Sequence, residues 1–114
     1  MESMKDKEVN LERGYPTVDM ALREMVSQLG TYKRQGYRAM ILVHGYGSSG
    51  TGGKIKTAVK AKLRESSLSG IVKKCCGGED WINHKREMLE ICSQLKNFES
   101  RIAGNPGITV VILK

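Results

Sequence analysis

The chain has 114 residues, enough for one domain with its own core, and its 19 Lys and Arg residues against 12 Asp and Glu give a formal net charge of +7. This charge favours an acidic partner, either nucleic acid or an anionic membrane surface. No apolar stretch reaches the roughly 20 residues of a membrane-spanning helix, and the charged N-terminus lacks the apolar segment of a secretion signal. We therefore expect one cytoplasmic domain over residues 1–114, with a disordered tail at 1–6 and no membrane partner.

The three cysteines, two of them adjacent, form a poor disulfide framework, so we expect reduced thiols. The only histidines are His44 and His84, and no C-x-x-C pair is present, so the sequence has no recognisable zinc-ligand spacing. We expect no metal site and no evident cofactor. Cys75 and Cys76 should point to opposite faces of one strand, and Cys92 should fill a helix face.

The first half of the chain predicts two strands joined by a helix. Polar and apolar residues alternate over 7–12, which is typical of a short strand. Apolar residues then recur every three or four positions over 18–35, with Thr17 as a plausible N-cap and Gly36 as a helix stop. The continuous apolar run that ends a strand over 37–43 suits a position covered on both faces. Such a unit is normally parallel and right-handed, and ligands collect at the carboxyl edge of its sheet.

The second half predicts a further helix over 53–64, a strand over 71–76 and an amphipathic helix over 84–100. After a glycine-rich turn, the β-branched run over 108–113 must be a strand that is buried on both faces. The order of elements indicates an α/β class: a two-layer α/β sandwich, βαβαβ(α)β, with an inserted helical region at 78–104.

A glycine-rich stretch, residues 44–56, joins the second strand to the second helix. Backbone N–H groups at such a junction can bind an anion. The stretch is not an NTPase phosphate loop, because Ser48 and Ile55 stand where G-x-x-x-x-G-K-[ST] requires a glycine and a hydroxyl. Neither apolar strand is followed by the carboxylate that would hold Mg²⁺.

The helix that follows the glycines carries only positive charge on its outer face. These residues are Lys54, Lys56, Lys60, Lys62 and Arg64, and no acidic residue follows before Glu65. A solvated helix face normally mixes signs, because like charges three or four positions apart repel. We therefore favour contact with phosphate groups over simple solubility.

Three motifs carry a resemblance to a known family: His44-Gly45-x-Gly47, Gly53-x-Ile55-Lys56, and the last strand with the glycine turn before it. Together they resemble the small MutS-related (Smr) domain, whose second motif reads H-G-x-G-x-G-x-L-R. The resemblance covers the chain from Val9 to Lys114. It implies a fold like the C-terminal domain of translation initiation factor three. It also implies nucleic-acid binding and, as in several family members, nicking of DNA or cleavage of RNA.

The matched motif assigns candidate binding residues to the loop and helix. His44 matches the motif histidine, and Lys56 stands in place of the motif arginine. In the family, the guanidinium of that arginine would bind phosphate by two hydrogen bonds. The loop is about four residues longer than the motif. The candidate nucleic-acid-binding residues are Gly45, Tyr46, Gly47, Gly50, Gly52, Gly53, Lys54, Lys56 and Lys60.

The candidate catalytic residues are His44 and Glu12. In the family the first strand reads L-D-L-H-G, whereas this chain has Asn10 in place of the acid and Glu12 in place of the histidine. A carboxylate can accept a proton in phosphodiester cleavage, so Glu12 with His44 and Lys56 would form a nuclease site, with a divalent metal as a conceivable aid. The alternative for Glu12 is a solvated carboxylate at a strand end.

Three functions therefore stay open. The first is binding of DNA or a structured RNA, ribosomal RNA included, and the second is an endonuclease activity. The third is a protein-interaction domain that acts through residues 81–102, with an unknown partner. The chain has few aromatic residues, which favours recognition of the nucleic-acid backbone over the reading of bases.

Overall fold

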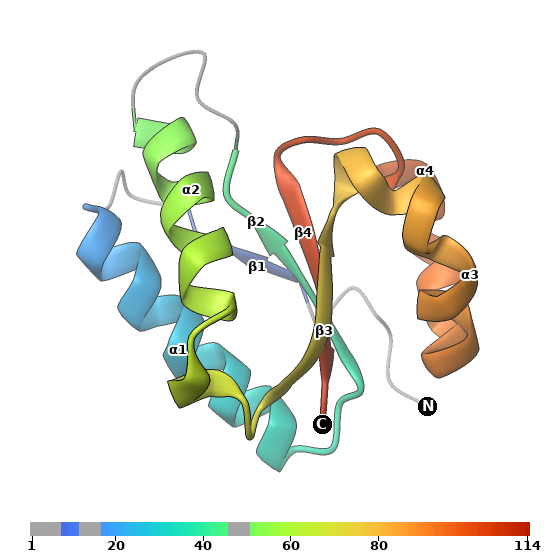
Figure 1. Ribbon diagram of the computed structural model, residues 1–114, viewed down its shortest axis with the longest axis horizontal. Helices are drawn as coiled ribbons and strands as arrows, with labels where there is room; N and C mark the ends of the chain where they lie inside the picture. The colour runs from blue at the N-terminus through green and yellow to red at the C-terminus, as the bar shows by residue number, and fades with distance from the viewer. Residues whose placement is uncertain (1–7, 12–16, 46–50) are drawn as a thin grey trace.

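A computed structural model of the chain describes residues 8–11, 17–45 and 51–114, with 51 and 52 described by their backbone alone. It forms a four-stranded sheet with helices on both faces (Figure 1). The expected tail at 1–6 lies outside the described residues.

The sheet has the strand order β1-β2-β4-β3. Its strands are β1 (Glu8–Asn10), β2 (Ala39–Val43), β3 (Val72–Gly77) and β4 (Ile108–Leu113). β1 pairs parallel with β2, as predicted, whereas β4 lies antiparallel to both β2 and β3. β3 therefore runs in the same direction as β2. The carboxyl ends of β1, β2 and β3 consequently lie at one edge of the sheet, where β4 begins.

α1 (Val18–Arg34) and α2 (Thr51–Leu63) cover one face of the sheet (Figure 1). α1 begins where expected, because the Thr17 hydroxyl accepts a hydrogen bond of 3.2 Å from the backbone N–H of Met20. It stops before Gly36, whose φ of +85° glycine adopts without strain. Both helix predictions are confirmed to within two residues at each end.

Apolar side chains of both helices form a buried layer against this face. The layer includes Met25 and Leu29 of α1, Ile55 and Val59 of α2, and Met40, Leu42 and Val111 of the sheet. Burial of a side chain of this size contributes about 1.5–3 kcal/mol. Packing, more than helix propensity, therefore holds the two helices on the sheet.

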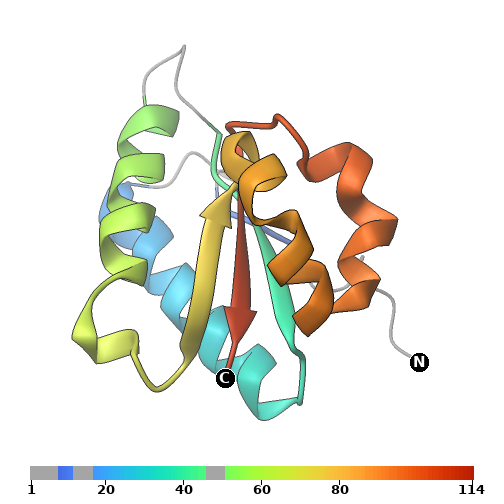
Figure 2. The same ribbon diagram turned by 45° about the vertical axis from the view of Figure 1, so that its right-hand side comes forward.

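Residues 78–104 cover the opposite face, as Figure 2 shows. The segment contains η3 (Gly78–Asp80), α3 (Trp81–Ile91), η4 (Ser93–Phe98) and α4 (Glu99–Ile102). The prediction of one continuous helix over 84–100 is wrong. The helix starts earlier, and the chain is extended at Cys92, with φ −139° and ψ 91°. This break folds the segment back, so that both of its arms pack on the sheet.

Trp81 joins the two arms of the insert. Its side chain is buried, and its indole N–H donates a hydrogen bond of 2.8 Å to Glu99 Oε2 at the start of α4. Met88, Leu95 and Ile102 are fully buried in the same cluster. Trp81 is therefore a core residue.

The α/β fold class is confirmed, and the insert adds a helical layer to the two expected ones. β2 and β4 are apolar on both faces: Met40 and Leu42 face α1 and α2, whereas Ile41 and Ile112 face the insert. A strand that is apolar on both sides needs cover on both sides. The insert supplies the second cover.

Cys75 and Cys76 lie on opposite faces of β3, as predicted, whereas Cys92 is the extended residue that ends α3. Cys75 packs partly buried on the α1 and α2 side, Cys76 is buried on the insert side, and Cys92 is buried at the end of α3. All three are free thiols. Among the described helices, none is both long enough and apolar enough to cross a membrane.

Candidate nucleic-acid interface

His44 and Gly45 follow β2 at the carboxyl edge of the sheet. Their backbone N–H groups both donate to the carbonyl oxygen of Gly107, at 2.9 and 3.1 Å. Gly45 has a φ of +72°, which a side chain would strain. The residues that enter the glycine-rich stretch are therefore fixed to the turn that precedes β4.

The His44 ring is fully buried, and both of its nitrogens have partners. Nδ1 lies 2.6 Å from the carbonyl oxygen of Gly45, and Nε2 lies 2.8 Å from Thr109 Oγ1. A carbonyl oxygen only accepts, so in the neutral ring Nδ1 donates and Nε2 accepts from the Thr109 hydroxyl. This geometry makes His44 a positioning residue for the edge, and its predicted catalytic role stays a prediction.

Several predicted site residues lie outside the described part of the chain. They are Glu12, Tyr46, Gly47 and Gly50. Gly52 and Gly53 belong to the first turn of α2, which begins close to the edge. The roles assigned to all of these residues stay predictions.

Two lysines of α2 converge on one carboxylate from the other side of β3. Glu79 Oε2 forms ion pairs with Lys56 and, at 3.8 Å, with Lys60. Lys62 instead pairs with Glu65 at 2.9 Å. Sequence reasoning missed Glu79, because it counted only the acidic residues of the helix itself. The adjacent Gly77-Gly78 pair was the available signal for a close approach of backbone or side chain at this point.

The Glu79 carboxylate lies over Gly77. A Cβ at position 77 would lie 3.0 Å from the carboxyl carbon of Glu79, so the missing side chain leaves the space that the carboxylate uses. Partial burial alone would raise the pKa of Glu79, but the hydrogen bond from Lys56 and the charges of Lys56 and Lys60 bring the pKa below its usual value. Glu79 is consequently ionised at neutral pH.

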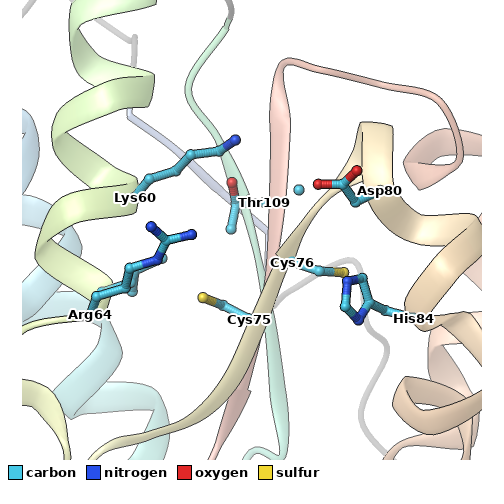
Figure 3. A pocket seen from close by; sticks show the side chains of 9 residues that line it. Lys60, Arg64, Cys75, Cys76, Asp80, His84 and Thr109 are labelled. Carbon is cyan, nitrogen blue, oxygen red and sulfur yellow. The ribbon is translucent and has the colours of Figure 1, made fainter.

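A pocket of about 220 Å³ lies beside this ion pair, between α2 and the insert (Figure 3). Lys60 and Arg64 extend into it from the α2 side, and Asp80 and His84 approach from the insert side. Its floor includes Thr109, the partner of His44. We call it the α2–β3 pocket. It links the basic helix to the edge of the sheet.

The thiols that line the α2–β3 pocket are poor nucleophiles. Burial raises the pKa of Cys75, although Arg64, Lys60 and Lys74 oppose the shift, and burial raises the pKa of Cys76 to about 11. Both groups are therefore neutral thiols near pH 7. Within the described residues, no group of three or more His, Cys, Asp and Glu side chains could hold a metal ion.

The sheet, its covering helices and this edge define an α/β domain with a basic helix beside the carboxyl ends of its strands. The structure is similar to the Smr domain of Thermus thermophilus MutS2, with a TM-score of 0.61 and 26% sequence identity over 95% of this chain and 98% of the other. No protein-family model matches the chain, and a comparison with curated proteins gives no match. By its fold, the chain is an Smr-like domain.

Proposed function

We propose that this Smr-like domain binds nucleic acid through the basic side of α2 and the adjoining sheet edge. The observation that carries the proposal is the set of cations that α2 and the residue after it present. Lys56, Lys60 and Arg64, spaced four positions apart, share one side, and Lys60 and Arg64 line a pocket that opens beside the edge, whereas Lys54 lies in the first turn of the helix. The likeness to the Smr domain of MutS2 supports the same class of function.

Phosphate contact is the mode of binding that this set of side chains favours. Lysine ammonium groups bind phosphate as point charges, and the Arg64 guanidinium can form two parallel bonds with it. No carboxylate pairs with Arg64 or Lys54 among the described residues. Lys62, which pairs with Glu65, lines a different groove with α1 residues, so we assign the contacts to four cations.

The test is a salt titration of binding to duplex DNA, single-stranded DNA and a structured RNA, with fluorescence anisotropy as the readout. Four phosphate contacts give a log–log slope of about −3.6 on duplex DNA. The triple variant Lys54→Ala/Lys60→Ala/Arg64→Ala should lose about tenfold or more in affinity and bring the slope near −1. Lys33→Ala, a change of the same sign at the exposed end of α1, is the matched control and should bind almost as wild type does. Affinity that does not depend on salt would contradict the proposal.

An endonuclease activity is the second candidate. It depends on His44, which matches the family's motif histidine and lies at the sheet edge, and on Glu12 as proton acceptor. A plasmid-nicking assay with Mg²⁺, Mn²⁺ or a chelator tests it. If His44→Gln and Glu12→Gln both nick plasmid at the wild-type rate, the assignment of these two residues is contradicted. His84→Gln, the other histidine, is the control.

The third candidate is a protein-interaction domain, but much of its proposed interaction segment is part of the core. The large apolar side chains Trp81, Met88 and Leu95 of the 81–102 segment pack in the core, and deletion would uncover the sheet. Ile82, 78% exposed, is the side chain of the segment that a partner would contact, and Ile82→Ser tests this without unfolding the domain. The cytoplasmic location stays a prediction from the sequence.

A further inference from the structure

Lys56 and Lys60 converge on a single oxygen atom, Glu79 Oε2. An ionised oxygen held by two ammonium groups is the arrangement that a phosphate oxygen would adopt in the same place. The site is accessible from solvent, because the side chains of Lys56, Lys60 and Glu79 are 18%, 38% and 32% exposed. A phosphate group of a bound polymer can therefore reach it.

The backbone holds the Glu79 carboxylate in this place. Gly78 packs so tightly that a Cβ there would lie 3.1 Å from the carbonyl carbon of Asn105, and its own carbonyl accepts a hydrogen bond of 2.9 Å from the N–H of Gly104. On the other side, Gly77 leaves open the space that the carboxylate occupies. The start of the insert thus presents one carboxylate to α2.

The adjacent α2–β3 pocket continues the positive surface on its α2 side, opposite Asp80 and His84 of the insert. Lys60 takes part in both places, and Arg64 lies one helical turn further along, without a paired carboxylate among the described residues. Figure 3 shows both side chains reaching from the α2 side toward Thr109 and Cys75. A phosphate held by Lys56 and Lys60 would therefore have a second cation close by for the next phosphate.

We propose that Lys56 and Lys60 form a phosphate site for nucleic acid and that Glu79 is its internal competitor, which a phosphodiester must displace. This inference rests on the proposed function and deepens it by naming the residue that limits the affinity. Displacement exchanges one carboxylate for one phosphate on the same two ammonium groups. Ligands of high charge density are consequently favoured over weak anions.

Two variants test the competition by different routes. Glu79→Gln removes the charge, and Gly77→Ala pushes the carboxylate aside without a change of net charge. Both should bind duplex DNA or structured RNA about two to five times more tightly than wild type, a gain in the range of one surface ion pair. Glu65→Gln is the matched control, because it removes the same charge from the carboxylate that pairs with Lys62. It should change the affinity less than twofold.

Thermal unfolding of each variant, compared with wild type, checks that the fold is kept. Three outcomes would overturn the role of Glu79 as a competitor while nucleic-acid binding stands. Glu79→Gln could bind as tightly as wild type, it could bind more weakly, or Glu65→Gln could show the same gain. Failure of wild type and every variant to bind any of the polymers overturns the proposed function itself. The two failures are therefore distinguishable.

Discussion

α2 and the insert (residues 78–104) lie on opposite faces of the sheet and meet around the end of β3 with opposite charges. α2 presents Lys56 and Lys60, and the insert presents Glu79. Each also covers its own face with apolar side chains. The comparison shows that the insert is both a structural layer and the source of the counter-charge that limits the positive surface of α2.

The largest expected effect tests the insert as a structural layer. Trp81→Ala removes a buried indole and its hydrogen bond to Glu99, and should lower the free energy of unfolding by about 3–5 kcal/mol. Urea unfolding followed by circular dichroism measures it. The neighbouring Ile82→Ala, at an exposed position, should stay within about 0.5 kcal/mol of wild type. Similar values for both variants would mean that the insert is not part of the core.

Gly78→Ala tests the rigid start of the insert. The new methyl group would overlap the carbonyl groups of Ile102 and Asn105, so the turn before β4 must move. We expect a loss of about 2–3 kcal/mol in urea unfolding. Gly70→Ala is the matched control, because a Cβ there meets no atom within 4 Å and should cost little. A loss of equal size in both variants would point to backbone entropy and not to close packing.

Thr109→Val tests the edge on the α2 side. The change keeps the shape but removes the hydroxyl that donates to His44 Nε2, so a buried acceptor loses its partner. The expected loss is about 1–2 kcal/mol. In the NMR spectrum, the ring nitrogens of His44 should also shift. Thr57→Val, at an exposed position of α2, is the control and should leave the His44 signals unchanged.

The smallest effect concerns pH. The pKa of Glu79 is lowered below its ordinary value of 4.5, so the ion pair stabilises the fold above that pH and is lost as pH falls through the lowered pKa. The stability difference between wild type and Glu79→Gln should be below about 1 kcal/mol and constant near neutrality, and should shrink as pH falls through the lowered pKa of Glu79. Chemical unfolding at pH 7, 5 and 3 measures it. A difference that is unchanged from pH 7 to pH 3 would assign it to packing.

Local pattern sufficed for most of the fold. Thr17 and Gly36 bound the first helix because capping and positive φ are properties of single residues. The apolar runs of β2 and β4 indicated burial on both faces, and the parallel pairing of β1 with β2 followed from the helix that connects them. The helix break at Cys92 was missed, because no glycine or proline marks it and packing of both arms on the sheet imposes it.

The sequence by itself determined the order of helices and strands, the basic side of α2 and the histidine at the carboxyl edge, because periodicity and charge depend on residues that are close together in the sequence. Only the tertiary structure decided that Glu79 faces Lys56, 23 positions away, and that Thr109 holds His44, 65 positions away. Such contacts depend on which faces of distant elements meet. Burial and pairing at the candidate site are therefore consequences of the assembled sheet and its two helical layers.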